Sequence, residues 1–222
     1  MKQILCFGDS NTYGLIPGTQ GRFERGIRWT SLVEKDLYRK GYRVAEEGLC
    51  GRTSVFDDKY REGRNGSKLL PVLLETHSPI DIVVLMLGTN DCKYEYETTP
   101  QKIGDGIETL IDQIQTYDPN ISILLVSPIA LGDKVWEEGY DTEFNEQSVK
   151  VSKELPKVYE KIARRKGIDF LAASDYAKPS DIDREHLDVD GHWIIAAVIS
   201  DKIDKIISDK VESIDFCYKI AN

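Results

Sequence analysis

The chain has 222 residues, of which 41% are hydrophobic and 30% are charged, as in an ordinary globular protein. This length suits one α/β domain spanning residues 1–222. The formal net charge of −9 repels phosphates and anionic lipids, so we expect neither nucleic acid nor a membrane surface as a partner.

The first apolar run, residues 3–7, is too short for the core of a signal peptide, and no apolar stretch is long enough to span a bilayer. We therefore expect a cytoplasmic protein. The four cysteines, Cys6, Cys50, Cys92 and Cys217, form no spacing typical of a zinc site with the histidines. We expect reduced thiols and no metal.

Strand-like and helix-like segments alternate along the chain. In chain order, the sequence predicts a strand at residues 4–7, a helix at 28–39, a strand at 42–45, a helix at 69–77, a strand at 80–87, a helix from Pro100, a strand at 121–126, a helix around 151–162, a strand at 168–171 and a helix from about Trp193. The almost unbroken apolar run at 80–87 is typical of a central parallel strand. The alternation predicts an α/β fold, a three-layer α/β/α sandwich around a parallel, flavodoxin-like sheet.

Polar clusters follow the predicted strands at the points where these strands end. The clusters are Gly8-Asp9-Ser10, Gly51-Arg52-Thr53, Gly88-Thr89-Asn90-Asp91 and Asp183-Arg184-Glu185-His186. Ligands of such sheets bind beyond the carboxyl ends of the strands. The sequence therefore predicts one site built from all four clusters.

Ser10 is the candidate nucleophile of this site, because it lies at a glycine-flanked turn between a strand and a helix. The alternative is that Asp9 or Ser10 only caps the helix. The segment lacks the Gly-Lys-Ser/Thr ending of a phosphate loop, and it contains no GxGxxG pattern.

A serine nucleophile needs a general base, and the chain offers three histidines. His77 precedes a strand, at the wrong edge of the sheet, and is expected to be structural. His186 follows Asp183 by three residues, so that carboxylate can orient the ring. His192 is the rival, but it has no acid at that spacing and is expected to cap or pack a helix start.

Acyl transfer also needs donors for the oxyanion that forms. The candidates are the side-chain amide of Asn90 and the backbone N–H groups of Gly51 and Ser10. Asn90 and Gly51 are also residue types that turns favour, so a turn role is the alternative for each of them.

Together, the four clusters resemble the SGNH, or GDSL-type, hydrolase family. The resemblance implies Ser10, Asp183 and His186 as the catalytic triad, and Ser10, Gly51 and Asn90 as the oxyanion hole, with Asp9 and Asp91 in support. Glu47-Gly48-Leu49 and Met86-Leu87-Gly88-Thr89-Asn90-Asp91 are most similar to the bacterial arylesterase and acyltransferase branch. Two residues depart from the family pattern: Asn11 replaces a Leu, and Arg184 stands where a Gly usually follows the Asp.

The resemblance implies a serine esterase for small short-acyl esters, acetyl or aryl, that needs no cofactor and can also transfer acyl groups. The alternatives are a carbohydrate O-acetyl esterase, a lysophospholipase or a thioesterase of the same fold, and a non-catalytic flavodoxin-like binding domain. The irregular segment 130–143, with Trp136 and Tyr140 expected to be exposed, is a candidate partner contact or substrate-channel wall. The oligomeric state stays open, with a homo-oligomer as one option.

Overall fold

Five parallel strands form the central sheet in a computed structural model that describes the backbone of residues 1–221 and the side chains of residues 1–210. The strands are β1 (Lys2–Gly8), β2 (Tyr42–Gly48), β3 (Ile82–Met86), β4 (Ser122–Ser127) and β5 (Asp169–Ala172). They lie in the order β2-β1-β3-β4-β5, and all neighbouring strands are parallel. This is the flavodoxin-like order, so the predicted fold class is confirmed.

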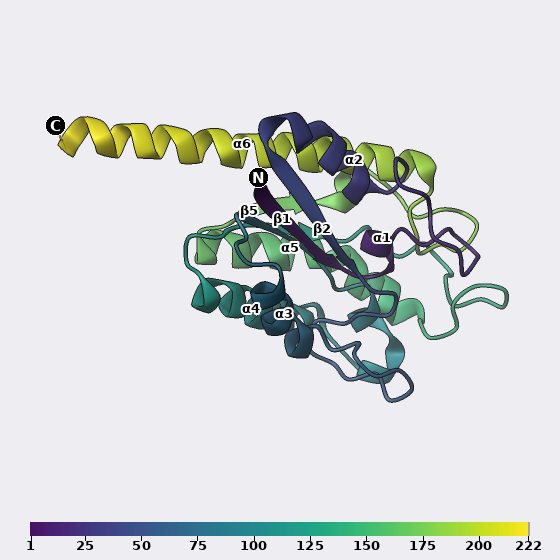
Figure 1. Cartoon of the computed structure of the whole chain (residues 1–222). Coiled ribbons are helices and arrows are strands. Elements are labelled where there is room, and N and C mark those ends of the chain that lie inside the picture. The colour runs from purple at the N-terminus through teal and green to yellow at the C-terminus, as the bar shows by residue number, and fades with distance from the viewer. Residues whose placement is uncertain (222) are drawn as a thin grey trace.

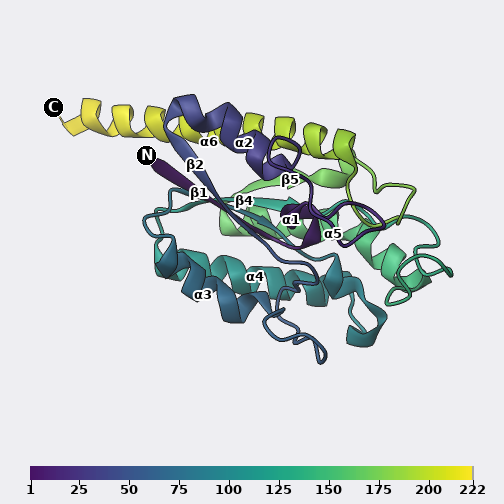
Figure 2. The same ribbon diagram turned by 45° about the vertical axis from the view of Figure 1, so that its right-hand side comes forward.

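Helices cover both faces of the sheet, as Figure 1 shows. The helices are α1 (Ser10–Tyr13), α2 (Trp29–Leu37), α3 (Gly66–Thr76), α4 (Pro100–Tyr117), α5 (Glu146–Lys166) and α6 (Val189–Ala221). Single 3-10 turns are η1 (Tyr38–Lys40), η2 (Asn90–Cys92), η3 (Tyr94–Tyr96) and η4 (Ala173–Asp175). Helices α2 and α6 pack on one face and α3, α4 and α5 on the other, and the turned view in Figure 2 separates these three layers.

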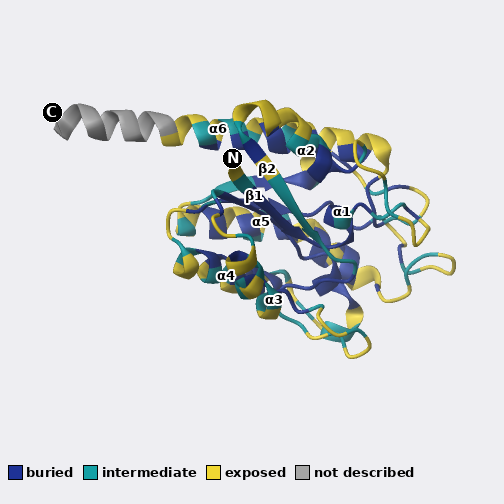
Figure 3. Ribbon diagram, viewed as in Figure 1, coloured by how far each residue is buried: buried dark blue, intermediate teal, exposed yellow. Residues whose placement is uncertain are grey.

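Strand β1 illustrates why the inner strands are largely apolar, whereas the edge strand β2 is only partly buried and carries charged residues. Ile4 and Cys6 point to the core under α2 and α6, whereas Leu5 and Phe7 point to the core under α3, α4 and α5. Successive strand residues face opposite sides, so an inner strand of a sheet that is covered on both faces buries its side chains on both faces. Full burial of an Ile, Leu or Phe side chain stabilises the fold by roughly 1.5–3 kcal/mol. Figure 3 shows this buried centre between exposed outer helix surfaces.

The last helix begins earlier than predicted. Helix α6 starts at Val189, four residues before Trp193. Asp188 lies before the helix, where its side chain accepts the N–H of Gly191 and its carbonyl accepts the N–H of His192. The prediction was wrong because it followed the apolar residues and overlooked an aspartate at a favoured capping position.

The strand order fixes where a ligand site can form. The chain passes from β1 outward to β2, returns to β3 on the other side of β1, and continues to β4 and β5. Beyond the carboxyl ends of β1 and β3, the connecting helices diverge to opposite faces and leave a crevice. The turns after these two strands carry Ser10 and Asn90.

None of the helices, over the residues that the structure describes, has both the length and the apolar character required to cross a membrane.

Candidate active site

In the turn after β1, Asp9 rather than Ser10 caps the following helix. Asp9 is the N-cap of α1, and its Oδ1 accepts the backbone N–H of Asn11 at 3.0 Å. Ser10 is the first residue of α1 and is only 3% exposed. Because Asp9 supplies the cap, the Ser10 hydroxyl is left to contact other groups.

That hydroxyl contacts His186, which lies 176 residues further along the chain. The His186 Nε2 atom lies 2.8 Å from Ser10 Oγ, and the His186 Nδ1 atom lies 2.8 Å from Asp183 Oδ2. Asp183 Oδ1 also accepts the backbone N–H groups of Glu185 and His186, at 3.1 and 3.0 Å. One carboxylate therefore both folds the loop and orients the ring, in the geometry that activates a hydroxyl as a nucleophile.

Neighbouring carboxyl groups shift the proton affinity of this pair. Burial lowers the pKa of His186, but the carboxyl groups of Glu185 and Asp183 outweigh burial and raise it to about 9. Burial raises the pKa of Asp183, but the hydrogen bonds and charge of His186 bring it below its usual range. The site therefore stabilises an imidazolium, the state that a general base reaches after taking a proton.

The other two histidines lie outside this arrangement. His192 is buried and its Nδ1 accepts the N–H of Trp29 at 3.3 Å, so it caps the start of α2 rather than its own helix. Burial lowers the pKa of His192 to about 4, which keeps the ring neutral. The His77 ring lies 2.7 Å from a carboxylate oxygen of Glu47 and does not line the cavity that Ser10 faces.

The residues predicted to supply the oxyanion donors, Ser10, Gly51 and Asn90, line the same cavity. Gly51 has φ +82°, in the left-handed region that favours glycine, and a Cβ atom there would lie 2.3 Å from the Arg61 guanidinium. Among the described residues, the Gly51 and Ser10 N–H groups donate to no protein acceptor. Asn90 Nδ2 donates to the carbonyl of Arg52 at 3.2 Å, and an amide has a second hydrogen to offer.

Asp91, expected as a supporting residue, fixes the loop that carries Gly51. Its two carboxylate oxygens accept the backbone N–H of Ser54 at 3.0 and 3.1 Å, and Oδ1 also accepts the Ser54 hydroxyl. Burial raises the pKa of Asp91 to about 6. Asp9 is equally buried and burial raises its pKa too, opposed by the N–H of Asn11.

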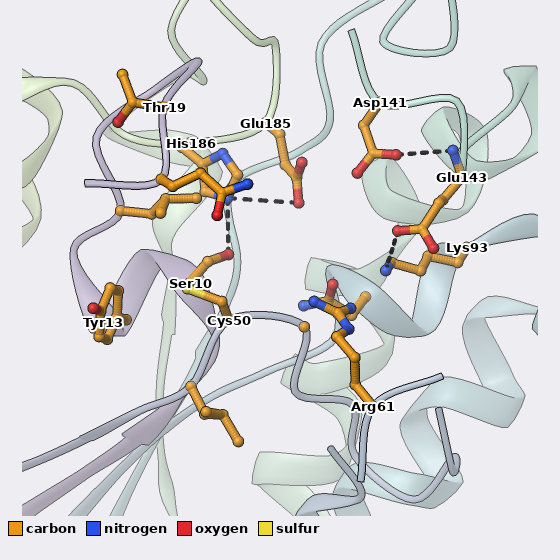
Figure 4. A pocket seen from close by; sticks show the side chains of 15 residues that line it. Ser10, Tyr13, Thr19, Cys50, Arg61, Lys93, Asp141, Glu143, Glu185 and His186 are labelled. Atoms are coloured by element: carbon orange, nitrogen blue, oxygen red, sulfur yellow. Dashed lines mark hydrogen bonds and ion pairs between the residues drawn. The ribbon is translucent and has the colours of Figure 1, made fainter. Parts of the chain in front are cut away.

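Ser10 and His186 face a cavity of about 530 Å³, a size typical of small-molecule sites. Its lining residues are Ser10, Tyr13, Leu15, Thr19, Gln20, Leu49, Cys50, Gly51, Arg61, Asn90, Lys93, Asp141, Glu143, Glu185 and His186. Figure 4 shows charged side chains gathered across the cavity from Ser10. The far wall is therefore polar, whereas Tyr13, Leu15 and Leu49 add apolar surface.

Segment 130–143 forms part of that wall, to which it contributes Asp141 and Glu143. The Glu143 carboxylate lies 2.5 Å from Lys93 Nζ. The expectation that Trp136 and Tyr140 are exposed was wrong, because both are half-buried. Trp136 packs against the core under α3, α4 and α5. The Arg184 guanidinium lies 4.0 Å from the centre of the Tyr140 ring and covers it.

Arg184 was noted in the sequence only as a departure from the family pattern. Its φ of +61° lies in the left-handed region, which explains why a glycine is usual at this position. Its side chain donates to the carbonyls of Asp133 and Lys134 at 3.1 and 3.2 Å. Arg184 therefore ties the histidine loop to segment 130–143.

Sequence reasoning assigned no role to Asn11 or Glu185. The Asn11 side chain donates to the carbonyl of Glu185 at 3.4 Å and accepts the N–H of Leu187 at 2.9 Å, which joins the serine turn to the histidine loop. Glu185 lines the cavity with its carboxylate 3.7 Å from His186 Nε2. The sequence did contain a sign of this role, since Glu185 is an acid that directly precedes the candidate base His186.

No cluster of His, Cys, Asp and Glu side chains suited to a metal ion occurs within residues 1–210, where side chains are described.

Comparisons with known proteins found a matching family and similar solved structures. The model of the GDSL-like lipase/acylhydrolase family matches residues 6–194. A carbohydrate acetylesterase from Sinorhizobium meliloti is a similar solved structure, with 33% identity over 93% of this chain and 100% of that one, at a TM-score of 0.86. An aryl esterase from M. smegmatis, solved with an inhibitor, has 29% identity over 92% of this chain and 99% of that one, at a TM-score of 0.85. Among curated proteins, none matches the chain.

Proposed function

Because the chain belongs to the GDSL-like lipase/acylhydrolase family of carboxylic ester hydrolases, we propose that it hydrolyses small short-acyl esters through an acyl-enzyme on Ser10. The observation that carries the proposal is the unbroken chain from Ser10 Oγ to His186 to Asp183, with both contacts at 2.8 Å, facing a cavity of about 530 Å³. Acetyl and aryl esters are the proposed substrates.

In the first half of the proposed reaction, His186 Nε2 takes the proton of Ser10 while Oγ attacks the ester carbonyl. The charge that develops on the carbonyl oxygen is held by the N–H groups of Ser10 and Gly51 and by the amide of Asn90. Asp183 keeps the proton of Nδ1 in place and stabilises the imidazolium. The carbon–oxygen bond to the alcohol then breaks, and His186 Nε2 gives its proton to the leaving oxygen.

In the second half, water attacks the acyl-enzyme while His186 takes one of its protons. The serine oxygen leaves with that proton, and the carboxylic acid is released. An alcohol in place of water would give acyl transfer instead. All proton transfers pass through His186 Nε2, so the proposed chemistry uses only side chains and backbone groups of this chain.

Labelling with a fluorophosphonate probe tests the proposal directly. We expect the folded protein to be labelled, with the modified peptide containing Ser10, and to hydrolyse phenyl acetate. A series of phenyl esters from acetyl to octanoyl should give the highest kcat/KM for the shortest acyl groups. Folded protein that neither reacts with the probe nor cleaves phenyl acetate would instead support a non-catalytic binding domain.

A carbohydrate O-acetyl esterase is the second candidate, favoured by the charged and hydrogen-bonding wall of Arg61, Lys93, Asp141 and Glu143. Polar groups in a binding cavity fix the orientation of polar ligands such as sugars. A panel of an acetylated sugar, phenyl acetate, a lysophospholipid and an acyl thioester separates this candidate from the arylesterase, lysophospholipase and thioesterase alternatives.

Asn90→Ala is expected to lower kcat for phenyl acetate by about 10²- to 10³-fold, the usual loss for one oxyanion donor. KM should change little, because the donor acts mainly on the charge of the transition state. The matched control is Asn120→Ala at an exposed position, which should keep wild-type kcat. Wild-type kcat in a folded Asn90→Ala variant would remove Asn90 from the oxyanion hole.

The pH dependence of kcat/KM should follow the ionisation of His186. A general base must be neutral, and its neighbouring carboxyl groups raise the pKa of His186 to about 9. We therefore expect kcat/KM for phenyl acetate, corrected for spontaneous hydrolysis, to rise with pH up to about 9. Glu185→Gln removes one source of that shift, so its acid limb should move to lower pH. An acid limb near the ordinary histidine pKa of about 6.5 in both proteins would contradict this explanation.

A further inference from the structure

Glu185 is a buried acid with no hydrogen-bond donor of its own. The residue is 6% exposed and lines the cavity beside His186, as Figure 4 shows. Within residues 1–210, no group donates a hydrogen bond to its carboxylate. The nearest basic atom is His186 Nε2 at 3.7 Å, which is beyond hydrogen-bond distance.

Two hydrogen bonds anchor the backbone of Glu185. The Glu185 N–H donates to Asp183 Oδ1 at 3.1 Å, and the Glu185 carbonyl accepts from the Asn11 side chain at 3.4 Å. These two bonds anchor the backbone of Glu185 at the cavity, which its side chain lines. A carboxylate that is buried without donors is costly, and burial raises the pKa of Glu185 to about 7. A donor that relieves this cost, either water or a bound ligand, must therefore come from the cavity that Glu185 lines.

The position of Glu185 identifies which half of an ester it would meet. In the proposed reaction, His186 Nε2 protonates the leaving alcohol oxygen, which requires that oxygen to lie within about 3.2 Å of Nε2. Glu185 lies 3.7 Å from the same nitrogen, so it faces the alcohol half. A hydroxyl on the carbon next to the ester-bearing carbon would reach it.

On this basis, and resting on the proposed function, we propose that Glu185 is a specificity residue. It accepts a hydrogen bond from a hydroxyl on the carbon adjacent to the ester-bearing carbon of the alcohol half. The substrate class is therefore monoesters of vicinal diols. Orienting His186 is not the role of Glu185, because Asp183 already holds Nδ1 at 2.8 Å.

A pair of esters of equal size tests this role. In 2-hydroxyethyl acetate a hydroxyl replaces the terminal methyl group of n-propyl acetate, so the ratio of their kcat/KM values reports on that hydroxyl. Glu185→Leu removes the acceptor and should lower the ratio by about 10- to 100-fold, the range expected for a hydrogen bond to a charged group. Glu185→Gln keeps a neutral acceptor and should lower it less, by about 3- to 10-fold. The intrinsic reactivities of the two esters cancel, because only the change in ratio counts.

Three controls distinguish a loss of specificity from a loss of folding or of Ser10 reactivity. Thermal unfolding and fluorophosphonate labelling establish that each variant is folded with a reactive Ser10, and Glu138→Gln, at an exposed position, should keep the wild-type ratio. A purely electrostatic role for Glu185 would change both esters equally and leave the ratio unchanged, which would overturn the proposal. Wild-type protein that cleaves phenyl acetate but not 2-hydroxyethyl acetate would overturn it too. Failure to cleave any ester would instead count against the proposed function.

Discussion

Ser10→Ala is expected to lower kcat for phenyl acetate by about 10⁶-fold, the loss found when the nucleophile of a serine hydrolase triad is removed. The variant keeps the oxyanion donors and His186 but has no atom that can form the acyl-enzyme. Fluorophosphonate labelling should disappear together with hydrolysis. Initial rates at saturating ester, measured against the uncatalysed rate, give the size of the loss.

The variant should fold normally, because the Ser10 hydroxyl faces the cavity. Its removal leaves one atom, His186 Nε2, without its hydrogen-bond partner, and water in the cavity can take that place. Ser208→Ala is the matched control, since Ser208 is exposed and, among the described side chains, its hydroxyl donates to the carbonyl of Asp204 alone. That control should keep wild-type kcat. Substantial hydrolysis by folded Ser10→Ala protein would show that another residue attacks the ester.

Asp183→Asn is expected to lower kcat by about 10⁴-fold, as found for the equivalent change in a serine protease triad. In the wild type, Asp183 Oδ2 lies 2.8 Å from His186 Nδ1, so it accepts the Nδ1 proton and leaves Nε2 free to act as the base. An amide group at this position can donate to Nδ1 and so favour the wrong tautomer. It also removes the charge that stabilises the imidazolium. Steady-state kinetics on phenyl acetate measure this loss.

Asp181→Asn is the matched control, because Asp181 is exposed in the same loop. It should leave kcat unchanged. A loss of less than tenfold in Asp183→Asn would limit the contribution of the carboxylate to about 1.4 kcal/mol and would indicate a Ser10–His186 dyad. Thermal unfolding must accompany the kinetics, since Asp183 also accepts the backbone N–H of Gly18 at 3.0 Å.

Much of the arrangement around Ser10 could be predicted because strand ends constrain it. Parallel strands bring their carboxyl ends to one edge, so Ser10 after β1 and Asn90 after β3 had to be neighbours once the sheet was recognised. The spacing of Asp183 and His186 within one short loop also limited how far apart they could lie. These relations follow from chain connectivity and strand pairing, which apolar patterns reveal well.

Side-chain directions in the irregular segments could not be predicted in the same way. Trp136 and Tyr140 belong to a segment without periodicity, and what buries them comes from elsewhere: the core for Trp136 and the side chain of Arg184 for Tyr140. Glu185 could have faced solvent, but it lies in a loop whose backbone is bonded to Asp183 and Asn11, and there it lines the cavity. Such contacts join residues far apart in sequence, and no local pattern encodes them.

The link through Arg184 has a consequence for how this cavity can change. Residue 184 lies within the loop that holds Asp183 and His186, and its side chain is bonded to carbonyls of the segment that forms the far wall. Remodelling that wall to admit a larger alcohol therefore also disturbs the anchor of the histidine loop. Free-energy effects of substitutions in the two segments are then not additive. Substrate range and catalytic geometry are therefore coupled in this chain. A broader cavity requires compensating changes both in segment 130–143 and in the histidine loop.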